Sequence, residues 1–149
     1  MLKLFLAVTL ALSVADAALA QSGSLSQTVN GVTIYLGVIP SEIIRRHPQE
    51  HDESVMHGSP PKGSGYRHIV VALFDAKTKE RIKDAKVTAR VEQLGLTADH
   101  KDLDAMPIAG TISYGNFFRM PGEGPYKIRV IVKRKDSQHP IEGSFEYRG

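Results

Sequence analysis

The sequence has 149 residues and no cysteine. It therefore forms no disulfide, offers no thiolate metal ligand and has no cysteine that could carry a lipid anchor. After the N-terminal segment there is no second long apolar run, so we expect no transmembrane helix in the mature chain. A chain of this length can instead bury an adequate apolar core as one domain.

Familiar catalytic motifs are also missing. There is no G-x-S-x-G, no P-loop and no H-E-x-x-H, so we expect a protein that is not an enzyme. An unrecognised hydrolase, with a triad whose members are distant in sequence, is the third and weakest alternative.

The chain has a formal net charge of +3. Its basic residues within 77–86 and 127–135 are interleaved with acids or alternate along expected strands. Two interpretations stay open: solvated strand faces, or a contact with an acidic partner or membrane surface. Nucleic acid is not an expected partner of an exported chain.

Residues 1–20 have the features of a cleavable export signal. Lys3 supplies the positive charge, residues 4–14 form a short apolar run, and Ala18-Leu19-Ala20 has the small-x-small pattern of a cleavage site. We therefore expect a periplasmic protein, with a flexible mature N-terminus over 21–31 and one domain over 32–149.

Alternating apolar and polar residues predict an all-β domain. Turn signals separate the runs every eight to twelve residues, as in an Ig-like antiparallel β-sandwich of about seven strands. The expected strands are 32–38, 66–75, 85–92, 106–112, 114–120, 126–133 and 141–147, with a polar connection over 99–104. A long loop over 39–65 carries at most one helical turn, from Ser41 through Arg46.

The long loop is rich in side chains that bind metals. Imidazole suits borderline metals and thioether suits soft ones, so a mixed set favours copper, in particular Cu(I). Neighbouring carboxylates suit Cu(II), zinc or iron, or orient a ligating histidine. The alternative is a polar loop that happens to be His-rich. The set comprises His47, His51, Met56 and His57, with Glu50, Asp52 and Glu53 beside them.

Three further residues have two interpretations each. His68 lies near the start of the expected strand 66–75, on the same face as Val70. It is either a ligand at the mouth of the sandwich or a hydrogen-bonded strand residue. Met106 and Met120 each precede a proline at a strand end. They either bind metal or fill gaps at the sandwich edge.

The C-terminal half resembles a known family. Residues 106–127 contain Met-Pro, then Ser-Tyr-Gly, then Met-Pro-Gly-Glu-Gly-Pro-Tyr-Lys, and residues 145–147 read Phe-Glu-Tyr. These motifs resemble the periplasmic copper-binding proteins associated with high-affinity iron transport, which have an Ig-like fold. The chain is also similar to YtkA-like domains, through its strand–turn pattern and its Pro-Gly-x-Gly-x-Tyr turn. The resemblance extends over about residues 32–147.

The resemblance implies a set of copper ligands. Met106 matches a family methionine, and His51-Asp52-Glu53 matches a His-x-Glu, which makes His51 a ligand and Glu53 a weaker one. Ser113 stands where the family has a ligating histidine, so His57 or His68 would have to replace it. Met120 is a weaker candidate from the same comparison.

From these observations we expect a copper-binding protein that stores or delivers metal, or assists an inner-membrane iron or copper transporter. Zinc and iron are the other candidate ions. The resemblance also implies a homodimer. The competing hypothesis is a metal-free Ig-like interaction module that contacts a membrane or periplasmic protein through its edge strands or its long loop.

Overall fold

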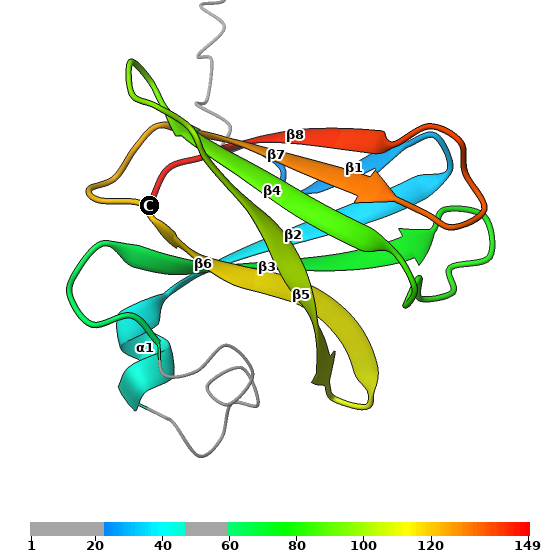
Figure 1. The fold of residues 1–149 in the computed structure, drawn as a ribbon, viewed down its shortest axis with the longest axis horizontal. Helices are drawn as coiled ribbons and strands as arrows, with labels where there is room; N and C mark the ends of the chain where they lie inside the picture. Colours follow the sequence, from blue (N-terminus) through cyan, green and yellow to red (C-terminus); the bar gives the residue numbers. More distant parts are fainter. Residues whose placement is uncertain (1–22, 47–59) are drawn as a thin grey trace, which may run out of the picture.

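The computed structural model describes residues 23–46 and 60–149, which form one β-rich domain. The predicted export signal, residues 1–20, and residues 47–59 of the predicted long loop lie outside these ranges. The described residues form eight strands and one short helix (Figure 1). Their bounds are β1 Ser26–Val29, β2 Val32–Pro40, α1 Ser41–Arg46, β3 Tyr66–Asp75, β4 Lys86–Gln93, β5 Asp99–Ile108, β6 Thr111–Arg119, β7 Tyr126–Lys133 and β8 Ile141–Tyr147.

All described strand pairs are antiparallel and follow one another in a single sheet, in the order β1-β2-β3-β6-β5-β4-β7-β8. The sheet curls until its two edge strands, β1 and β8, lie side by side (Figure 1). A side-chain bridge joins these edges, since the Ser144 amide donates to Gln27 Oε1 at 2.8 Å. The result is a nearly closed barrel.

β5 is the strand that turns the corner of the barrel. Its first half, Asp99–Leu103, pairs with β4, and its second half, Asp104–Ile108, pairs with β6. The strands β4 and β6 therefore diverge on either side of one continuous strand, which bends the sheet toward closure.

The barrel interior is filled by alternate residues of the strands. Along β3, Ile69, Val71 and Leu73 belong to the core cluster, and along β6 Tyr114 and Phe118 do. The intervening residues face outward because successive side chains on a strand point to opposite faces. This alternation gives the β3–β6–β5 region two faces, one in the core and one outside it.

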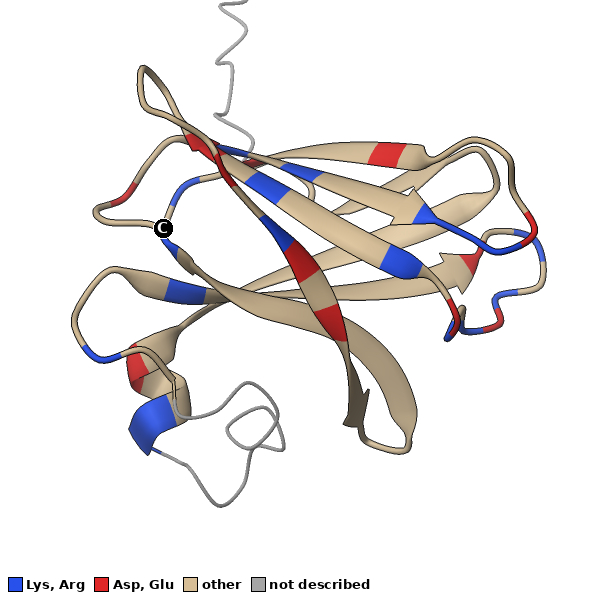
Figure 2. Ribbon diagram, viewed as in Figure 1, with Lys and Arg blue, Asp and Glu red and all other residues tan. Residues whose placement is uncertain are grey.

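The expected all-β, antiparallel class is confirmed, but the structure does not show an Ig-like sandwich of about seven strands. It describes eight strands in one continuous sheet. Two segments expected to be irregular are strands: Ser26–Val29 pairs with β2, inside the predicted flexible N-terminus, and Asp99–Asp104 belongs to β5. Both are polar, with at least half of their residues exposed, so they carry little apolar alternation. Figure 2 shows charged residues of both signs along β5.

The helix α1 follows β2 directly and lies outside the barrel (Figure 1). It spans the single turn expected from the sequence, contacts β2 and β3, and buries Ile44. Arg45 Nη1 donates to the Pro61 carbonyl at 2.6 Å, so the segment that leads into β3 lies against α1. Among the described residues, no helix has the length and apolar character needed to cross a membrane.

Candidate metal centre

Four buried side chains form a cluster on the outer face of the barrel, which we call the outer cluster: His68 of β3, Met106 of β5, and Ser113 and Phe117 of β6. None of the four belongs to the core inside the barrel. His68 and Met106 nevertheless have no exposed surface. Potential nitrogen and sulfur ligands are thus buried together outside the core.

Gly115 is the point at which His68 and Met106 converge. A Cβ placed on Gly115 would lie 2.5 Å from Met106 Cε, 2.8 Å from His68 Nε2 and 3.0 Å from the Ile69 carbonyl oxygen. Two different side chains therefore occupy the space above one strand glycine. A glycine inside a strand often marks such a close approach, and here it brings the imidazole nitrogen and the thioether end together.

The imidazole is held by the ring of Phe117. The two ring centroids are 4.5 Å apart with an interplanar angle of 26°, which is a stacked arrangement. His68 and Phe117 are also register partners across β3 and β6. The stack fixes the plane of the imidazole while Nε2 points toward Gly115.

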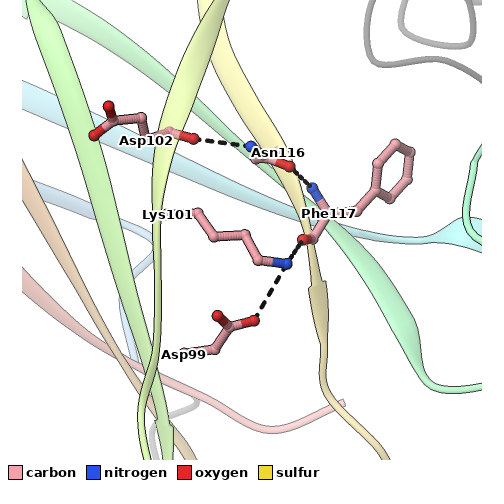
Figure 3. A network of polar contacts seen from close by, with 5 residues as sticks. All are labelled: Asp99, Lys101, Asp102, Asn116 and Phe117. Atoms are coloured by element: carbon pink, nitrogen blue, oxygen red, sulfur yellow. Dashed lines mark hydrogen bonds and ion pairs between the residues drawn. The ribbon is translucent and has the colours of Figure 1, made fainter.

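A network of polar contacts fixes the backbone of Phe117 (Figure 3). Asn116 Oδ1 accepts from the Phe117 amide at 2.8 Å, and Asn116 Nδ2 donates to the Asp102 carbonyl at 2.9 Å. Lys101 Nζ donates to the Phe117 carbonyl at 2.7 Å and pairs with Asp99 at 3.3 Å. These side chains bridge β5 and β6 where their backbones separate, so the strand switch also supports the ring under His68.

Arg81 stands next to Ser113, the position where the resemblance would place a histidine. Its Nη2 donates to Ser113 Oγ at 2.7 Å and its Nε to the Ile112 carbonyl at 2.9 Å. Burial lowers the pKa of Arg81, but a guanidinium stays protonated at neutral pH. A fixed positive charge therefore lies at one side of the outer cluster.

Asp104 brings a carboxylate next to Gly115. It is the register partner of Gly115 in the β5–β6 pair and shares its outward face. Unlike the outer cluster, Asp104 is exposed. Sequence reasoning missed Asp104 and Gly115, because only the β5–β6 register brings them next to Met106. It missed Arg81, because only the hydrogen bond to Ser113 links that residue to the outer cluster.

Of the six predicted ligands, three lie in the described residues, and the structure places these three at two sites. His68 and Met106 come together over Gly115. Met120, directly after β6, is fully buried in the core inside the barrel and does not join them. His51, Glu53 and His57 lie outside the described residues. Within the two described ranges, no group of three or more His, Asp or Glu could hold a metal ion. A centre there would have to include the Met106 thioether.

Comparison with known proteins supports the fold. No family model matches the chain, and no curated protein matches it. Among solved structures, FetP of uropathogenic Escherichia coli is similar over 85% of this chain and 93% of its own, with a TM-score of 0.63 and 14% identity. A copper-bound variant of FetP matches as well.

Two other structures have the same fold. A DUF4426 family protein from Pseudomonas aeruginosa covers 83% of this chain and 94% of its own, with a TM-score of 0.62 and 14% identity. The copper-reconstituted P19 protein from Campylobacter jejuni covers 83% and 91%, with a TM-score of 0.58 and 10% identity. The predicted resemblance to periplasmic copper-binding proteins is thus confirmed as structural similarity at low sequence identity.

Proposed function

We propose that this protein binds copper, most favourably Cu(I), at a centre that includes His68 and Met106. The observation that carries the proposal is their convergence: Nε2 of one and Cε of the other lie less than 3.0 Å from a single point above Gly115. Imidazole and thioether together suit Cu(I) better than they suit a hard ion. Bound copper would supply a redox-active ion, and the protein would hold or release it.

The surroundings support a preorganised centre. The stack on Phe117 orients the imidazole, and ligands whose orientation is fixed in advance bind a metal more tightly than mobile ones. Asp104 adds an oxygen donor on the same face. His51, Glu53 and His57 remain proposed ligands from the loop between α1 and β3. The residues before and after that loop lie close together, because Arg45 of α1 donates a hydrogen bond to the Pro61 carbonyl.

The proposed role is non-enzymatic. The similar structures include copper-bound proteins, and the predicted export signal supports action in the periplasm. There the protein would store or deliver copper, or assist an inner-membrane iron or copper transporter, and it would act as a homodimer. Zinc and iron are the competing ions.

The test is a metal titration of the mature protein with Cu(I), Cu(II), Zn(II) and Fe(II). We expect sub-micromolar binding of Cu(I), weakened at least tenfold by His68→Ala and by Met106→Leu. Met106→Leu preserves volume and should cost less than about 1.5 kcal/mol of stability, so lost binding would report the lost thioether.

Matched controls exist for both variants. His100→Ala removes an exposed histidine of β5, and Met120→Leu changes a methionine buried in the core. Neither should change the copper affinity. Binding that responds equally to Met120→Leu and Met106→Leu would place the ion elsewhere. If the protein binds none of the four ions, the competing hypothesis of a metal-free interaction module is favoured.

A further inference from the structure

Arg81 is held more firmly than an ordinary surface arginine. Besides its two hydrogen bonds to β6, its guanidinium carbon lies 4.7 Å from the ring centroid of Phe74. Arg81 also forms an isolated bridge with Phe74 after the turn that begins at Asp75. Contacts on two sides therefore fix the charge in place, and it cannot swing away from the outer face as a mobile side chain would.

The guanidinium is close enough to act on an ion at the outer cluster. Ser113, which accepts from Arg81, is the register partner of Met106 and lies two residues from Gly115 on the same face. Two residues along a strand span about 7 Å. Arg81 therefore places a full positive charge roughly 7–10 Å from the point where His68 and Met106 converge.

We propose that Arg81 makes the centre selective for ions of lower charge, so that it favours singly charged Cu(I) over Cu(II) and Zn(II). This inference rests on the proposed copper function. A fixed cation repels a divalent ion more strongly than a monovalent one, while the ligands stay the same. At this separation, one additional charge on the ion weakens its binding roughly tenfold in a partly hydrated protein environment.

The charge that opposes this effect is Asp104. It faces the same side of the sheet as Gly115, but it is exposed, so water and salt screen its field more than they screen the partly buried guanidinium. Ser113 contributes as well, because its hydroxyl accepts from the guanidinium and holds the positive charge beside the outer cluster.

The experiment measures Cu(I) and Cu(II) affinities of the mature protein by competition with chelators of known affinity. Arg81→Met removes the charge and keeps an apolar chain against Phe74, and Arg81→Lys keeps the charge. In Arg81→Met we expect the affinity for Cu(II) to rise about tenfold more than the affinity for Cu(I). The reduction potential of the bound copper should fall by about 59 mV for each tenfold change in that ratio.

Arg81→Lys serves as the control and should keep the ratio of the two affinities within about threefold of the wild-type ratio, whatever its effect on stability. Thermal unfolding of each variant shows whether it is folded. Equal changes in both affinities, or a ratio that Arg81→Lys alters as much as Arg81→Met does, would reduce Arg81 to a structural role. A wild-type protein that binds neither ion would overturn the copper function itself, which is a distinguishable result.

Discussion

Met106 and Met120 show how differently the two faces of this sheet are used. Each precedes a proline near a strand end, and each is fully buried. Met120 packs in the core inside the barrel among apolar side chains. Met106 lies on the outside with His68 and Ser113, above Gly115. The same residue type fills a core in one place and meets potential metal ligands in the other.

The difference teaches that burial alone does not mark a core. Inside the barrel, apolar side chains gain stability from leaving water, at about 25 cal/mol per Å². In the outer cluster, an imidazole and a hydroxyl are buried with the thioether, although burial of polar groups costs free energy that their contacts must offset. The outer cluster is therefore the region where function is expected to have set the residue types.

The largest expected effect comes from Gly115→Ala. The added methyl would meet Met106 Cε at 2.5 Å, His68 Nε2 at 2.8 Å and the backbone oxygen of Ile69 at 3.0 Å. Overpacking of this kind costs about 2 kcal/mol. We expect a lower midpoint in urea unfolding and loss of copper binding, because the added methyl would displace both side chains.

Gly37→Ala is the matched control, since Gly37 also lies within a strand and its added methyl would meet Val70 atoms no closer than 3.7 Å. Its stability should change by less than about 1 kcal/mol. If both variants lose the same stability, the outer cluster is not tightly packed over Gly115.

A smaller effect is expected from Asn116→Ala. The alanine would leave the Phe117 amide and the Asp102 carbonyl without their side-chain partner (Figure 3). Removing the partner of such groups costs about 1–2 kcal/mol. Because Phe117 supports the imidazole of His68, we also expect weaker copper binding. Asn116→Asp keeps the acceptor, so its midpoint in urea unfolding should lie between those of the wild-type protein and Asn116→Ala. If neither variant changes the copper affinity, the polar network does not support the metal centre.

Much of the fold could be predicted because most strands alternate clearly. Val130 and Val132 of β7, and Val87 and Ala89 of β4, are buried at every second position as expected. The first half of β5 could not be predicted in this way, since only Leu103 is buried there and pairing with β4 makes it a strand. The closure of one sheet likewise depends on pairing between distant segments.

The candidate centre could be predicted only in part. His68 and Met106 were named from residue chemistry, but the sequence could not separate Met106 from Met120, which share the same Met-Pro context. Arg81 carries no local signal, because its role depends on contact with Ser113, thirty-two residues later in the chain. Asp104 and Gly115 become neighbours only through the β5–β6 register.

The smallest effect is expected inside the barrel, from Tyr114→Phe. The Tyr114 hydroxyl accepts from the Ala85 amide at 3.1 Å, and its loss should cost about 1 kcal/mol at neutral pH. Burial raises the pKa of Tyr114 in the folded protein. The folded state then holds a proton that the unfolded state releases, so the stability contributed by Tyr114 is lost as the pH rises above about 10.

Tyr114→Phe has no hydroxyl to titrate, so its free energy of unfolding lacks this pH dependence. The difference in stability between the wild-type protein and Tyr114→Phe should therefore narrow from neutral pH to pH 11, while the copper affinity stays unchanged. Tyr35→Phe, at an exposed tyrosine on the outer face of β2, is the control for loss of a hydroxyl and should leave the stability at neutral pH unaltered. A constant difference across this pH range would show that the Tyr114 hydroxyl titrates as in water. A change in copper affinity would contradict the separation of the two faces, because Tyr114 belongs to the core and not to the outer cluster.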